Sequence, residues 1–151
     1  MKYILVFFLV FFSLSKQDIS MFDFQNTTPI SFLDYLVENN QVNFVVVNND
    51  SIPVGWVNFD LLPELMNRIE SKRITAPVFS IYAGVDLNRK IRTTEGVEAL
   101  HLIESLRRKM AYPMLLSSEN YGYLNNHVFY PDTILVREIK QWYRKRSHNN
   151  R

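Results

Sequence analysis

The stretch TEGVEALHLIESLRRKM, residues 94–110, decides the fold that this sequence predicts. At 100° per residue its small and apolar residues fall on one stripe of a helix. Thr94 suits the capping position, and Arg107 and Arg108 complement the helix dipole at the other end. We therefore expect a central helix that lays one face on the core. The stripe consists of Gly96, Ala99, Leu102, Ile103, Leu106 and Met110.

The opposite side of this helix brings Glu98, His101 and Ser105 close to one another. A Glu-x-x-His pair can ligate a metal in di-iron helical bundles, but such a site needs a second pair and two further glutamates. This chain has one such pair only. We therefore expect a solvent-exposed face, with His101 neither catalytic nor a metal ligand, and a protein without metal or cofactor.

Three further helices are predicted from capping residues that precede apolar periodicity. Ser31 begins the first helix, and Asp34 completes a capping box. Asp60 caps the second helix, because Pro63 is tolerated only in the first turn. Asp132 caps the third helix, which runs toward the C-terminus.

Strands are predicted where β-branched and aromatic residues cluster between turn-forming residues. Residues 42–47 and 78–82 fit this pattern, and residues 121–130 fit a hairpin about Asn125-Asn126. The chain has 151 residues, a length that suits one domain. The prediction is an α+β fold: a single small domain with about four helices packed on three or four short strands.

The predicted hairpin has an aromatic face. With a turn at Asn125-Asn126, Tyr123 pairs with Val128 and Tyr121 pairs with Tyr130, and Phe129 points to the other side. An exposed aromatic face can stack on sugar rings or on a partner protein. The alternative is that the tyrosines pack beneath the central helix.

The C-terminal helix carries Trp142 and Tyr143 beside the basic run 144–146. One interpretation is a surface helix that touches anionic lipid headgroups or an acidic partner. The other is a helix docked on the domain, with residues 147–151 as a loose basic tail. The candidate contact surface combines this helix with the hairpin, through Tyr121, Tyr123, Tyr130, Trp142 and Tyr143.

The N-terminus, MKYILVFFLVFFSLSKQD, has the layout of a secretory signal peptide. Lys2 precedes the apolar run 3–12, and Ser13 and Ser15 supply small residues before a cleavage point. The run is shorter than the roughly 20 apolar residues of a membrane-spanning helix. We expect residues 1–15 to be removed, residues 16–29 to form an ordered or loose lead-in to a domain over 16–151, and a periplasmic or secreted location. The alternatives are an uncleaved anchor and a buried N-terminal helix.

Composition narrows the function classes. The chain contains no cysteine, which excludes disulfides and thiol chemistry, and its net charge of +2 is too small to predict nucleic-acid binding. No nucleophile elbow, P-loop or zinc-protease motif occurs. We expect a non-catalytic binding module of the cell envelope, with another envelope protein or a carbohydrate as partner. The alternative is a small extracytoplasmic hydrolase of a wall polymer or polysaccharide, whose carboxylates the sequence does not identify.

The export prediction can be tested by intact-mass analysis of the protein purified from its native host. The expected mass is that of a chain that begins at or near Lys16, which is about fifteen residues shorter than the full sequence. A full-length mass in the soluble fraction would contradict the prediction.

Overall fold

The structure is a computed structural model that describes residues 19–42, 44–47, 51–80, 92–109, 112 and 122–149. Helix and sheet are mixed, as predicted, and the described part contains four α-helices. The predicted signal segment 1–15 lies outside the described residues. The helices are α2 (Pro29–Glu38), α3 (Leu62–Arg68), α4 (Glu95–Arg108) and α5 (Thr133–Asn149), with a 3₁₀ turn, η2 (Phe59–Leu61), before α3. The strands are β1 (Ile19–Met21), β2 (Phe44–Val47), β3 (Ile74–Thr75), β4 (Val78–Ser80), β5 (Thr93–Thr94), β6 (Gly122–Asn125) and β7 (Val128–Pro131).

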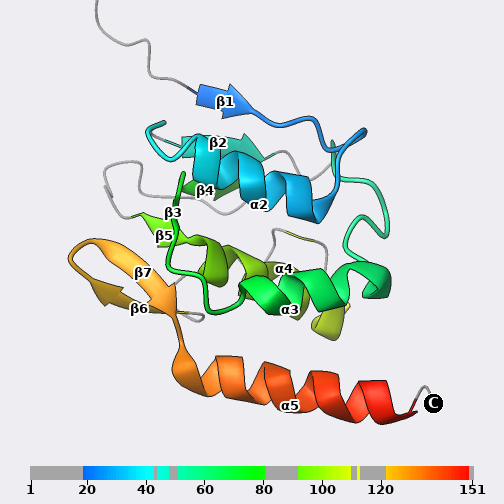
Figure 1. Cartoon of the computed structure of the whole chain (residues 1–151). Helices are drawn as coiled ribbons and strands as arrows, with labels where there is room; N and C mark the ends of the chain where they lie inside the picture. The colour runs from blue at the N-terminus through cyan, green and yellow to red at the C-terminus, as the bar shows by residue number, and fades with distance from the viewer. Residues whose placement is uncertain are drawn as a thin grey trace, which may run out of the picture.

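A parallel sheet of order β1-β2-β4 forms one side of the protein, and α2 lies over it (Figure 1). Val45 occupies the middle of the sheet, where it aligns with Ser20 of β1 and Val78 of β4. Strand β1 lies within the predicted lead-in over residues 16–29 and pairs with β2. Its three residues are too few for a recognisable alternation, and β2 supplies the pairing that orders them.

The hairpin β6–β7 is present, but its turn lies one residue later than predicted, which shifts the strand pairing by two residues. The turn is at Asn126-His127, with φ of 48° and 62°, so Tyr123 pairs with Tyr130. Main-chain hydrogen bonds also join β7 to the segment before β5, because the Phe129 N–H donates to the Arg92 carbonyl at 2.8 Å and the Arg92 N–H donates to the His127 carbonyl at 3.0 Å. Phe129 is buried in the core.

Two of the observed helix starts differ from the predicted ones, because other residues make the capping contacts. The Thr28 hydroxyl accepts from the Ser31 N–H at 3.1 Å, so α2 begins before Ser31. Asn58 rather than Asp60 caps η2, by accepting from the Asp60 N–H at 3.0 Å. Asp132 caps α5 as predicted. This helix continues to Asn149, which is three residues into the predicted loose tail.

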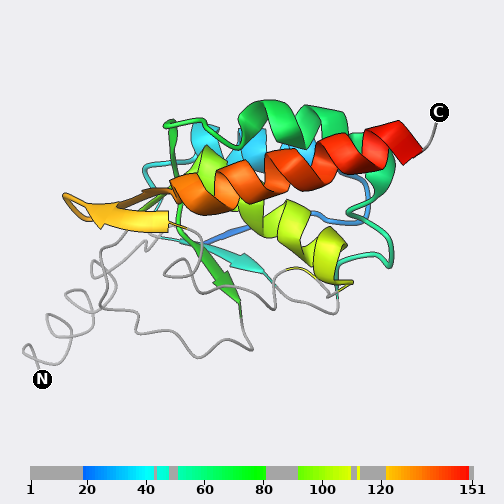
Figure 2. The same ribbon diagram turned by 90° about the horizontal axis from the view of Figure 1, so that it is seen from below.

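Helix α4 is buried on all sides from Glu95 to Ser105. It contacts α2, α3, β5 and β7, and α5 lies across the outer side of α3 and α4 (Figure 2). The predicted exposed face is therefore wrong: Glu98 and His101 are each 1% exposed. Glu98 accepts from the Thr93 hydroxyl at 2.6 Å, and its other oxygen lies 3.2 Å from His101 Nδ1. These contacts satisfy a polar face that neighbouring elements cover.

The N-terminal end of α4 is held by a buried carboxylate. The Glu95 side chain is 2% exposed and accepts from Arg68 Nη1 at 2.7 Å and from Arg73 Nε at 2.8 Å. The Ser71 hydroxyl donates to it as well. These contacts attach α4 to α3 and to the loop that follows α3.

Gly96 allows this loop to approach the helix. A Cβ at Gly96 would lie 2.6 Å from Pro131 Cγ and 2.7 Å from the Ser71 carbonyl oxygen, closer than atoms pack. The Gly96 N–H instead donates to that carbonyl at 3.1 Å. A side chain at this position would force α4 away from β7.

We predict that Glu95→Gln lowers stability at neutral pH by about 1–3 kcal/mol, because two arginines lose their shared carboxylate. Burial is the largest effect on the Glu95 carboxyl and raises its pKa, but the hydrogen bonds from Arg73, Ser71 and Arg68 together outweigh burial and lower the pKa. This stabilisation is therefore present above the unfolded-state pKa and is lost as the pH falls through the lower, folded-state pKa.

Urea melts of the wild type and of Glu95→Gln should differ at neutral pH and converge in acid. The control is Glu64→Gln, an exposed change on α3 that should stay within about 0.5 kcal/mol of wild type. A Glu95→Gln difference that is unchanged in acid would show that the charge of Glu95 is not what stabilises the fold.

Candidate functional site: an aromatic and basic cavity

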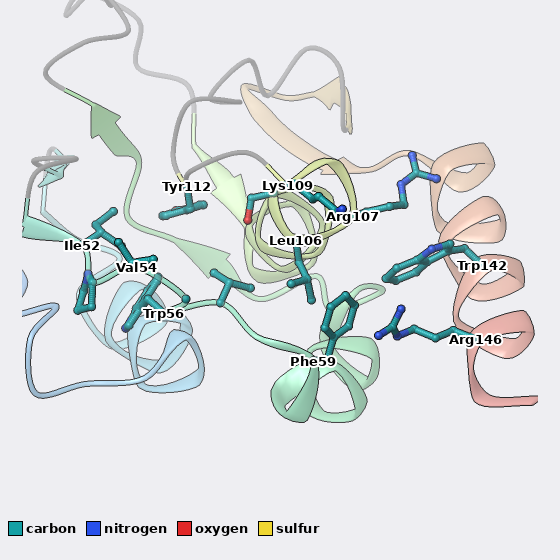
Figure 3. A pocket seen from close by; sticks show the side chains of 14 residues that line it. Ile52, Val54, Trp56, Phe59, Leu106, Arg107, Lys109, Tyr112, Trp142 and Arg146 are labelled. Atoms are coloured by element: carbon teal, nitrogen blue, oxygen red, sulfur yellow. The ribbon is translucent and has the colours of Figure 1, made fainter. Parts of the chain in front are cut away.

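Three parts of the chain that are far apart in sequence surround a cavity of about 520 Å³ (Figure 3). They are the loop over residues 52–59, the end of α4 with Tyr112, and the C-terminal half of α5. The volume lies in the range of about 300–1,000 Å³ that is typical of small-molecule sites. The lining residues are Ile52, Pro53, Val54, Gly55, Trp56, Val57, Phe59, Ser105, Leu106, Arg107, Lys109, Tyr112, Trp142 and Arg146.

Trp56 forms a fixed wall of the cavity. Its indole N–H donates to the Thr27 carbonyl at 2.8 Å, and its ring meets the Phe24 ring edge-on at a centroid distance of 5.1 Å. The turn beneath it closes through a hydrogen bond from the Trp56 N–H to the Pro53 carbonyl. Gly55 supplies the positive φ of 75° that this turn requires. Trp56 is therefore part of the core and of the cavity wall at once.

Helix α5 supplies the facing wall. Val136 and Ile139 are buried and anchor its apolar side on the core, and Trp142 is half-buried one turn further along. The Arg146 guanidinium carbon lies 3.5 Å from the centre of the Phe59 ring, a cation–π contact between α5 and η2. The apolar side of α5 therefore packs against the core of the protein.

The C-terminal end of α4 makes the cavity basic. Arg107 and Arg108 both pair with the fully buried Glu104, at 2.5 Å and 2.7 Å. Lys109 ends the helix in the left-handed conformation, with φ of 55°. It has no ion-pair partner among the described residues. None of the described lining residues is acidic.

Tyr112 brings a buried hydroxyl to the cavity. The residue is 4% exposed and packs its ring edge-on to Phe32 at 5.9 Å. Its hydroxyl has no hydrogen-bond partner among the described residues. Burial, and after it the charge of Glu98, raise the pKa of the phenol well above its usual value, so the group stays neutral. A buried polar group without a partner is uncommon in folded proteins.

The predicted contact residues lie on two elements, the hairpin and α5, or outside the described residues. Trp142 lines the cavity, whereas Tyr143 is half-buried against the core. Tyr130 is half-buried in the hairpin and pairs with Tyr123 through the backbone, and Tyr121 lies outside the described residues. The hairpin adjoins the start of α5, while Trp142 lies toward its end (Figure 1).

The sequence did not predict most of the cavity. Trp56, Tyr112 and Arg146 lie more than thirty residues from one another in the sequence. None of the three belongs to a repeat or a motif. The available signal was that the chain has only two tryptophans. Both line this cavity.

We predict that Tyr112→Phe leaves the free energy of unfolding unchanged or raises it by up to about 1–2 kcal/mol, because it removes a buried hydroxyl without a partner. Trp56→Phe is the contrasting variant, since it leaves the Thr27 carbonyl without its donor and should destabilise. Urea melts measure both. A clear loss of stability in Tyr112→Phe would show that the hydroxyl is hydrogen-bonded in the folded protein.

Comparison of the chain with protein-family models, with curated proteins and with solved structures finds no significant match. None of the helices in the described part of the chain is both long and apolar enough to cross a membrane. The described residues contain no group of three or more histidine or acidic side chains that could hold a metal ion.

Proposed function

We propose that this protein is a non-catalytic binding module of the cell envelope and that it holds its ligand in the cavity between residues 52–59, α4 and α5. The observation that carries this proposal is the lining, which contains both tryptophans of the chain and no acidic residue among those described. Ligand sites are typically concave and mostly apolar, with a few polar groups that orient the ligand. A cavity of this size fits a small molecule better than a flat protein surface.

The geometry gives less support to a hydrolase. A carboxylate mechanism needs two acids that the substrate can reach. The acids beside the cavity, Glu98 and Glu104, are buried on α4. Glu98 is engaged by Thr93, and Glu104 is engaged by the arginines that follow it. A ligand-binding site does not need a free carboxylate, so the engagement of both acids is compatible with binding.

The envelope location and the binding activity are independent parts of the proposal. The location is supported by the pattern of residues 1–15 alone, and the mass measurement above tests it. The binding activity is supported by the cavity. Failure of one would leave the other standing.

Intrinsic fluorescence tests the binding activity, because both tryptophans line the cavity. In a screen of small molecules, a true ligand should raise Tm and change the emission of both single-tryptophan variants, Trp56→Phe and Trp142→Phe. A ligand at a hundredfold excess over its Kd stabilises the folded state by about 2.7 kcal/mol.

Two substitutions to phenylalanine extend this test: one lies inside the cavity, and the other is its matched control outside the cavity. Leu106→Phe narrows the cavity and should abolish binding, whereas Leu135→Phe adds the same ring against the core outside the cavity. A ligand that still binds the Leu106→Phe variant and leaves the emission of both tryptophans unchanged would show that the binding site lies elsewhere.

A further inference from the structure

We infer that the cavity binds a small anionic amphiphile: an apolar body against the aromatic wall, with a carboxylate, sulfonate or phosphate group at the basic end. This ligand class rests on the proposed function and names the chemistry that the same cavity selects. The inference combines the hydrogen-bonding capacity of the lining, its charge and its layout.

The charged side chains of the lining can donate hydrogen bonds but cannot accept them. Arg107, Lys109 and Arg146 are donors only, and no carboxylate or amide side chain occurs among the described lining residues. The remaining polar groups are largely engaged, since Trp56 donates to Thr27 and Ser105 donates to the Leu102 carbonyl at 2.7 Å. A ligand must therefore supply acceptors. A neutral sugar, whose hydroxyls also donate, would find few acceptors here.

The charge of the lining is positive and only partly compensated. Arg107 pairs with Glu104, whereas Lys109 has no ion-pair partner among the described residues. Arg146 has no ion-pair partner among the described residues. It presents its face to the Phe59 ring, so the N–H groups at its edge remain available to an anion. Apolar walls around such charges strengthen their attraction for anions.

One end of the lining is apolar, and the other end combines aromatic with basic residues. Figure 3 shows Ile52, Trp56 and Tyr112 on one side of Leu106, and Trp142 and Arg146 on the other. A ligand that spans Leu106 would place its apolar body on the Trp56 side and its charge beside α5.

The position of α5 favours a free amphiphile over a lipid bilayer. A helix that lies on a membrane inserts its apolar side into the lipid. Here Val136 and Ile139 are buried, and Leu135, Trp142 and Tyr143 pack against the same core. The apolar side of α5 is thus unavailable for insertion.

The test uses two fluorescent probes with the same aromatic body. Anilinonaphthalene sulfonate carries a negative charge, and phenyl naphthylamine is its uncharged counterpart. The full chain should bind the sulfonate at one site and at least about fivefold more tightly than the neutral probe at low salt. Bound sulfonate should quench the tryptophans, and added salt should reduce the preference.

Variants on one helix assign the charge. Arg146→Gln should reduce the preference for the sulfonate over the neutral probe at least about threefold. Arg144→Gln is the matched control, because it removes the same charge from an exposed position outside this cavity. Lys109→Gln provides a second variant should Arg146→Gln fail to unfold cooperatively in urea.

The outcomes separate this inference from the function on which it rests. Equal binding of both probes by the wild type would overturn the anionic ligand class and leave the binding cavity intact. Binding of neither probe would count against both. Loss of the preference in Arg144→Gln but not in Arg146→Gln would move the anion to the second basic hollow, beside Arg137 and Lys140. Sedimentation with anionic phospholipid vesicles in competition with the sulfonate would assign the site to a membrane and refute the inference.

Discussion

The fold depends on the carboxylate of Glu95, which is buried at the first turn of α4 and shared by Arg68, Arg73 and Ser71. A buried charge without partners costs several kcal/mol. The fold that places Arg68 and Arg73 beside Glu95 is therefore favoured over one that leaves this charge buried alone. Arg68 extends the network to α2, because the same guanidinium contacts Asp34 at 2.5 Å. Gly96 permits the close approach that these contacts require. One carboxylate thereby fixes three helices and the loop after α3 around a common point.

The place of the cavity follows from the burial of α4. With its N-terminal end held in the core and its polar side covered, the helix emerges only in its last turn. That turn carries Arg107, Arg108 and Lys109, which suit the negative end of a helix dipole. Arg107 and Lys109 form a basic wall of the cavity where α5 and the loop over 52–59 approach the helix end. A stabilising feature of the helix and a ligand-attracting feature of the surface thus come from the same charges.

Sequence patterns predicted the features that depend on neighbours along the chain. Four helices follow from apolar periodicity, and Asp132 caps α5 through a contact three residues away. Features that depend on distant segments were missed. The helical wheel placed Glu98 and His101 opposite the apolar stripe, but a wheel does not show whether water or another element covers a face. The cavity is the extreme case, since no local pattern connects Trp56 with Arg146.

The two walls of the cavity differ in rigidity, and this difference divides their roles. Trp56 and Tyr112 belong to the buried aromatic cluster of the core, so their positions are set before a ligand arrives. Arg146 and Lys109 are long side chains nearer the solvent, which can adjust to a charge. A preformed apolar wall reduces the ordering cost of binding and so contributes affinity. The adjustable cations contribute selectivity for charge, because they attract an anion without fixing its shape. Since the rigid wall is also core, a ligand that fills the cavity stabilises the fold through the same aromatic contacts.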